Sequence, residues 1–113
     1  MHELSIAKGL LEIVERELKK SGALRLERVK IEVGGMTAVE PESLRFCFEA
    51  CVKDTPMDGA RLDIVEVPVI GRCSRCAEEF RMDGLLSPCP ACGGSSIVRL
   101  TGTELKVVSI TAA

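Results

Sequence analysis

The sequence predicts an α+β fold in which two helices lie on a small three-stranded sheet, with a second, cysteine-rich unit inserted into the chain. Three observations support this class. Two segments carry apolar residues at helical spacing, three segments are strand-like, and residues 69–100 are rich in glycine and proline and contain two Cys-x-x-Cys pairs. With 113 residues, 46% of them hydrophobic and 28% charged, the chain has the composition of a folded protein.

Two segments are predicted to form amphipathic helices. In the first, before a stop at Gly22, apolar residues recur at helical spacing at Ile6, Leu10, Ile13, Val14 and Leu18. In the second, Pro41 suits the first helical turn, and the apolar face consists of Leu44, Cys47, Phe48, Cys51 and Val52. Free cysteine is among the most buried residue types, so we expect Cys47 and Cys51 to pack in the core rather than to bind a metal.

Three segments are predicted to form strands. In LERVKIEV (residues 26–33) apolar and charged residues alternate, and Gly34-Gly35 ends the pattern. The stretch ARLDIVEVPV (residues 60–69) predicts a strand that Pro68 ends or moves to a sheet edge. The stretch ELKVVSI is too apolar to stand alone, so we expect it to return to the sheet built from residues 25 to 67. One α/β domain would then comprise residues 1–68 and 101–113, and residues 69–100 would form an inserted domain.

The cysteines of the inserted segment have the spacing of a zinc site. Cys73, Cys76, Cys89 and Cys92 form the pattern C-x2-C-x12-C-x2-C. Each pair places two thiolates on one tight turn, and a hairpin between the pairs brings the four sulfurs into the tetrahedral arrangement that Zn(II) prefers. A shell of four thiolates leaves no position for water, so we expect a zinc-ribbon-like domain with structural zinc.

Composition and charge argue against several other functions. The formal net charge is -2, and four thiolates with one Zn(II) bring residues 69–100 to about −1, so we expect no nucleic-acid binding. A single histidine, with no nucleophile placed beside a base, argues against an enzyme. The chain shows no export signal and no apolar run of membrane-spanning length, so we expect a cytoplasmic protein without membrane contact.

The single histidine stands at position 2, in the opening MHELS. The amine of Met1, the backbone nitrogen of His2 and its imidazole can close two adjacent chelate rings on one metal if the amide deprotonates. Three in-plane nitrogens favour Ni(II) or Cu(II) over Zn(II). A fourth ligand could come from Glu3, through its backbone nitrogen or its carboxylate. The alternative is that His2 is only a solvated terminal residue.

Four features occur together and span nearly the whole chain: the opening MHELS, the strand LERVKIEVGG, the turn into EPESLRFCFE, and the cysteine pattern. This combination resembles the HypA/HybF family of nickel metallochaperones for hydrogenase maturation. The resemblance implies that Met1, His2 and Glu3 bind Ni(II) as transported cargo and that the four cysteines hold structural Zn(II). Some relatives carry histidines beside the zinc cysteines, whereas Ala77 and Gly93 follow the cysteine pairs here.

The resemblance further implies a metallochaperone, not an enzyme, that delivers nickel to nickel-iron hydrogenase and, in some relatives, to urease. Two protein partners are implied, a nickel-handling GTPase and the hydrogenase large subunit. The main alternative is a zinc-ribbon adaptor that binds other macromolecules and never carries nickel. His2 separates the two hypotheses, because an adaptor would tolerate its loss.

Overall fold

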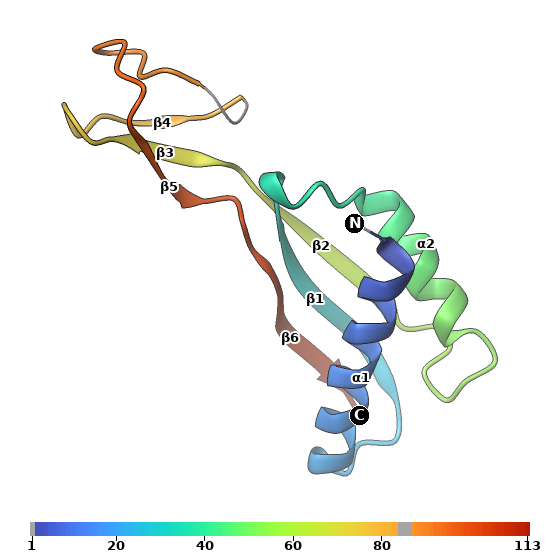
Figure 1. The fold of residues 1–113 in the computed structure, drawn as a ribbon. Coiled ribbons are helices and arrows are strands. Elements are labelled where there is room, and N and C mark those ends of the chain that lie inside the picture. Colours follow the sequence, from blue (N-terminus) through green and yellow to red (C-terminus); the bar gives the residue numbers. More distant parts are fainter. Residues whose placement is uncertain (1, 84–86) are drawn as a thin grey trace.

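The computed structural model describes residues 2–83 and 87–113 and shows an elongated molecule with two lobes (Figure 1). Its principal extents are 55 × 25 × 15 Å and its radius of gyration is 17.7 Å. A compact chain of this length would have a radius of gyration of about 13 Å. The difference arises because the chain builds two small sheets, one in each lobe, instead of a single central core.

The larger lobe contains two helices and a sheet with the strand order β2-β1-β6. Strand β2 (Arg61–Val67) runs parallel to the central strand β1 (Leu26–Gly34), and β6 (Leu105–Ala112) runs antiparallel to it. Helices α1 (Glu3–Ser21) and α2 (Pro41–Val52) cover the same face of the sheet (Figure 1). The α+β class is thereby confirmed, and the last strand lies against the first, as expected.

The core lies between β1 and the two helices. Val29, Ile31 and Val33 alternate along β1 and are buried, as the period of a half-buried strand requires. Helix α2 completes this core with three buried residues, Leu44, Phe48 and Val52. Pro41 opens α2 at its first turn, as predicted. Strand β2 ends at Val67, directly before Pro68, which has no N–H to continue a ladder.

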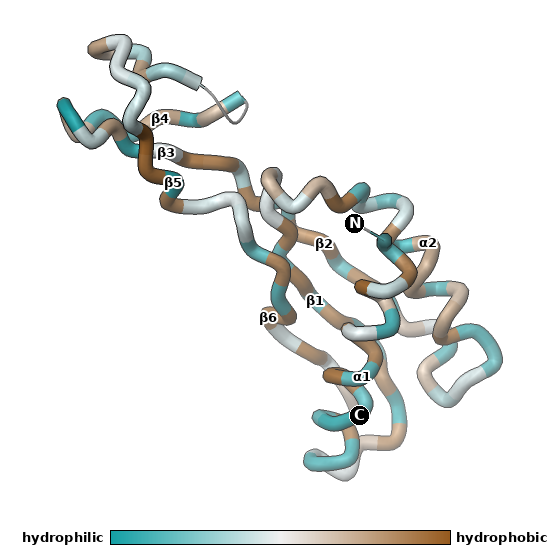
Figure 2. Tube along the Cα trace, in the orientation of Figure 1, coloured by the Kyte–Doolittle hydropathy of each residue, from teal (hydrophilic) through white to brown (hydrophobic). Residues whose placement is uncertain are grey.

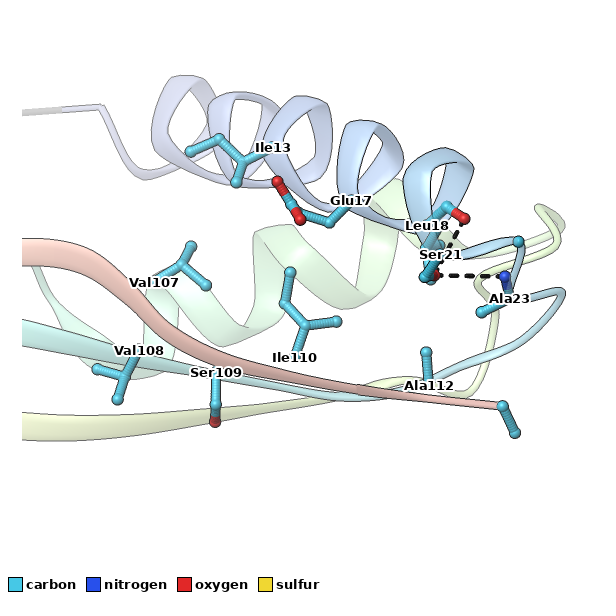
Figure 3. Close-up of a pocket in the computed structure, with 12 residues that line it drawn as sticks. Ile13, Glu17, Leu18, Ser21, Ala23, Val107, Val108, Ser109, Ile110 and Ala112 are labelled. Carbon is cyan, nitrogen blue, oxygen red and sulfur yellow. Dashed lines mark hydrogen bonds between the residues drawn. The ribbon is translucent and has the colours of Figure 1, made fainter.

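The buried face of α1 differs from the predicted one. Leu10 and Val14 are buried as expected, but Ala7 and Leu11 join them, and Ile13 is 39% exposed. The reason is that α1 packs against α2 as well as against the sheet, so its buried stripe is rotated toward α2. Ile13 instead faces a groove of about 830 Å³ between α1 and β6 (Figure 3).

Within the described residues, neither helix is both long and apolar enough to cross a membrane.

Cys47 and Cys51 are half-buried, not fully buried as core residues would be. They pack against the edge of the core from the flank of α2 that faces α1. Cys51 shares a shallow surface depression with Lys8 and Leu11 of α1. Two packed helices leave such a depression on their outer side, and this explains why the cysteines keep some exposure.

The smaller lobe is an antiparallel sheet with the strand order β4-β3-β5. Its strands are β3 (Ile70–Cys73), β4 (Glu79–Arg81) and β5 (Ile97–Thr101). In Figure 2, brown apolar segments alternate with teal along β1 and mark parts of β3 and β5, whereas the loops at the far end of the smaller lobe are mostly white or teal. A lobe with so few apolar residues needs an additional crosslink, such as a bound metal ion, to be stable. The first of its strands begins at Ile70 and the last ends at Thr101, close to the limits of the predicted insertion, residues 69–100. That these residues form a separate domain stays a prediction.

The two lobes meet at a hydrogen-bonded junction around Gly34 and Gly102. The backbone N–H of Gly34 donates to the Glu104 carbonyl at 2.7 Å, and that of Met36 donates to the Gly102 carbonyl at 2.8 Å. Met36 belongs to the short helix η1 (Gly35–Thr37). Gly102 has a φ of 109°, which favours glycine. The chain between β5 and β6 is therefore held at Gly102 and Glu104 by backbone hydrogen bonds from residues 34 and 36.

Candidate metal centres

The four cysteines of the smaller lobe converge on one point. Their sulfurs all lie within 4.8 Å of one another, and two pairs, Cys73 with Cys92 and Cys76 with Cys89, are separated by 3.5 Å. Tetrahedral Zn(II) with bonds of about 2.3 Å needs sulfurs about 3.8 Å apart, whereas a disulfide needs about 2.05 Å. The spacing therefore fits a shared metal ion. Among the described residues, no other group of three or more histidine, cysteine or acidic side chains has such an arrangement.

Each cysteine pair forms the same kind of tight turn. The N–H of Ala77 donates to the Cys73 carbonyl at 2.9 Å, and the N–H of Gly93 donates to the Cys89 carbonyl at 2.8 Å. Both donors have left-handed backbones, with φ of 65° at Ala77 and 74° at Gly93. In each pair the first cysteine is buried and the second is exposed. The two loops, which we call the knuckles (residues 73–77 and 89–93), thus present their sulfurs in equivalent ways.

The environment shifts the pKa values of the two thiols of the first knuckle in opposite directions. The backbone N–H groups of Cys76 and Arg75 lower the pKa of the Cys73 thiol to about 6 by stabilising its thiolate. The N–H of Glu78 also lowers the pKa of Cys76, but the adjacent Cys89 sulfur and the other thiols of the cluster help to raise it to about 12. Thiols this close cannot all ionise together without a cation. A divalent metal would supply that cation.

Of the predicted nickel residues, His2 and Glu3 lie at the start of α1, at the end of the larger lobe where α2 also begins (Figure 1). His2 is exposed, has an extended backbone with φ of −86°, and its side chain does not cap the helix. Its carbonyl accepts the N–H of Ile6 at 3.2 Å. The imidazole is therefore outside the packed core and open to a metal. Met1 lies outside the described residues.

Glu3 connects the two helix starts. Its carboxylate Oε2 accepts the backbone N–H of Glu40 at 3.4 Å, across 37 positions of sequence. Glu40 caps α2, because its own carboxylate accepts the N–H of Glu42 at 2.9 Å. No pattern in the sequence predicts that Glu40 lies beside Glu3. The available signal, an acidic residue before Pro41, indicates a helix start but not what lies beside it.

The chain is similar to known proteins along nearly its whole length. A family model described as "Hydrogenase/urease nickel incorporation, metallochaperone, hypA" matches residues 1–112. The chain belongs to the HypA family. Among curated relatives, hydrogenase maturation factor HypA from Geotalea uraniireducens is 44% identical over 107 residues, covering 95% of this chain and 94% of the relative. The same factor from Dechloromonas aromatica is 41% identical over 110 residues, covering 97% of each chain.

Solved structures of HypA proteins share the fold. The solution structure of the nickel metallochaperone HypA from Helicobacter pylori has a TM-score of 0.67 at 27% identity, covering 99% of this chain and 97% of that one. Another HypA solution structure has a TM-score of 0.73 at 27% identity, covering 100% of this chain and 97% of that one. Members of the HypA family are metallochaperones for maturation, not enzymes, so the resemblance drawn from the motifs is confirmed.

Proposed function

We propose that this chain binds Ni(II) at its N-terminus, through Met1, His2 and Glu3, and delivers it for the maturation of nickel-iron hydrogenase. The recipients would be a nickel-handling GTPase and the hydrogenase large subunit, and the family description extends the same role to urease. The work would take place in the cytoplasm. Nickel here is cargo, so its site must both hold the metal and give it up.

The observation that carries this proposal is the combination of an exposed His2 with an anchored Glu3. The His2 imidazole is free to bind a metal. Glu3, the next residue, is held in place by the contact between its carboxylate and the Glu40 N–H. The carboxylate is engaged in this way, whereas the Glu3 backbone nitrogen lies at the helix start and has no helical acceptor. This difference favours the Glu3 backbone nitrogen as the fourth donor beside the Met1 amine and the two nitrogens of His2.

We assign a structural role to the second metal. Cys73, Cys76, Cys89 and Cys92 would hold Zn(II) with all four positions filled by sulfur, leaving none open for water. Residues 69–100 contribute few buried apolar side chains, so the metal would supply much of the stability of this inserted domain. Zinc would therefore stabilise the smaller lobe, and the exchange of cargo would take place on the larger lobe.

Nickel titration of the untagged protein tests the proposal. The wild-type chain should bind one Ni(II) at the terminus, and extending the amino terminus by one residue should weaken binding sharply, because the extension replaces the free amine by a peptide nitrogen. His2→Ala should weaken binding further. Glu3→Gln keeps the backbone nitrogen and should bind nearly as well as the wild type. Affinity should fall as pH falls, because protons compete for the nitrogen donors.

Zinc content and circular dichroism serve as controls, since residues 2 and 3 precede the packed face of α1 and their changes should leave the fold intact. Equal nickel affinity and an equal absorption spectrum in the wild-type, extended and His2→Ala proteins would place the nickel site elsewhere. Absence of Ni(II) binding in the wild-type chain would favour a zinc-ribbon adaptor.

A further inference from the structure

Phe46 is an aromatic side chain that the fold leaves in water. It lies in the second turn of α2 and is 72% exposed, whereas Phe48, two residues later, is fully buried. The two differ because a helix turns by 100° per residue, so Phe48 faces the sheet and Phe46 points away from it. The chain contains three phenylalanines, and the fold leaves this one exposed at the surface.

The stability of the fold does not explain why position 46 carries a phenylalanine. An exposed phenylalanine contributes little apolar burial, and its intrinsic helix propensity is lower than that of alanine. Alanine at this position would therefore leave the helix as stable or more stable. Aromatic residues, phenylalanine included, are enriched at protein interfaces relative to the rest of the surface, and a ring on a helix offers a large apolar area with few side-chain torsions to order.

The neighbours of Phe46 on the helix surface are acidic. Glu42 precedes it by four residues and Glu49 follows it by three, and both are exposed and lie on the same side of α2. Arg45 forms an ion pair with Glu42 and so offsets one of these charges. Glu40, at the cap of the helix, is also exposed. The aromatic ring is therefore set in a surface with an excess of carboxylates.

This surface is close to the N-terminus. The contact between Glu3 and Glu40 ties the first turn of α1 to the start of α2, and Phe46 is about 9 Å further along the axis of α2. Leu4, in the first turn of α1, adds a second apolar side chain at 47% exposure. A protein that accepts a metal from His2 must bring its own ligands into bonding distance, so it has to cover this end of the larger lobe.

We propose that Phe46 is the anchor on which a nickel-accepting protein docks, and that this partner offers an apolar pocket rimmed by lysine or arginine side chains. The proposal rests on the proposed nickel function and names the surface used for transfer. The ring would enter the pocket, and Glu42 and Glu49 would face the basic rim. Charges of opposite sign across an interface mainly raise the association rate and fix the orientation of the partners.

Binding of the purified nickel-handling GTPase of the same organism tests this surface. Phe46→Ala should weaken binding about tenfold or more, whereas Phe46→Tyr, which keeps the ring, should bind nearly as well as the wild type. Glu49→Lys should slow association and reduce its dependence on salt. Transfer of Ni(II), measured as metal content after the two proteins are separated, should fall in Phe46→Ala although this variant itself binds Ni(II) normally.

Leu24→Ala is the matched control. Leu24 is 90% exposed, but it follows the far end of the 19-residue helix α1, about 28 Å from His2, and its loss should change neither binding nor transfer. Equal GTPase affinity in Phe46→Ala and the wild type would overturn the proposal, as would an equal loss in Leu24→Ala. A wild-type chain that binds Ni(II) but not the GTPase would overturn the docking surface alone. A wild-type chain that binds no Ni(II) would overturn the proposed function.

Discussion

Two substitutions in the knuckles should change zinc affinity in opposite directions. Ala77 and Gly93 occupy equivalent positions, both with a left-handed backbone and both donating an N–H to the first cysteine of their pair. A non-glycine residue pays roughly 1–2 kcal/mol for this conformation. A Cβ at Gly93 would meet no atom within 4 Å, so Gly93→Ala carries this conformational cost without a steric one. The variant should bind Zn(II) about 5- to 30-fold more weakly.

Ala77→Gly should have the opposite effect, because it removes the same cost from the first knuckle. The gain should be up to about fivefold in affinity, because the greater entropy of glycine in the unfolded loop offsets part of the conformational cost, and the same term reduces the loss in Gly93→Ala toward the lower end of its range. Ala91→Gly is the matched control, because Ala91 is exposed in the second knuckle and is not among the residues with positive φ. That substitution should leave affinity unchanged or slightly reduced.

Competition for Zn(II) with a chromophoric chelator at fixed pH measures all three variants against the wild type. The reasoning requires the order Ala77→Gly, wild type, Gly93→Ala from tightest to weakest. If Ala77→Gly and Gly93→Ala both weaken the site, or if neither differs from the Ala91→Gly control, then the left-handed turns are not what positions the sulfurs for the metal.

Three further outcomes are expected. Gly34→Ala should destabilise the larger lobe by about 1–3 kcal/mol in thermal or urea unfolding, because its Cβ would overlap the backbone of Gly102, whereas Gly35→Ala should cost less because it meets mainly the Val69 side chain. A smaller effect of Gly34→Ala than of Gly35→Ala would contradict the close junction. Cys73→Ser should abolish tight zinc binding and increase hydrogen exchange in residues 69–100 while the helical signal largely remains, and cooperative loss of both lobes would argue against two separable units. Hydrogenase activity in cells lacking the functional protein should recover with excess nickel, because a chaperone speeds delivery without performing chemistry, and failure at every tolerated concentration would indicate an obligatory scaffold.

The sequence by itself determined the features that depend on near neighbours along the chain. The period of β1, the start of α2 at Pro41 and the end of β2 before Pro68 follow from local backbone preferences and from which side chains share a face. The cysteine cluster was equally predictable, because a pair separated by two residues shares one tight turn wherever the chain takes it. Family membership followed from combining these local motifs with the opening residues.

The tertiary structure decided the features that depend on contacts between distant residues. No local pattern shows that α1 would turn toward α2 and leave Ile13 exposed, or that Glu3 would meet Glu40 across 37 positions. Phe46 and Phe48 are the same residue type two positions apart, and only the packing of α2 on the sheet makes one an exposed ring and the other a core residue. The physical reason is that periodicity specifies which residues share a face, whereas the partner that covers the face is chosen by the competition among all elements for burial.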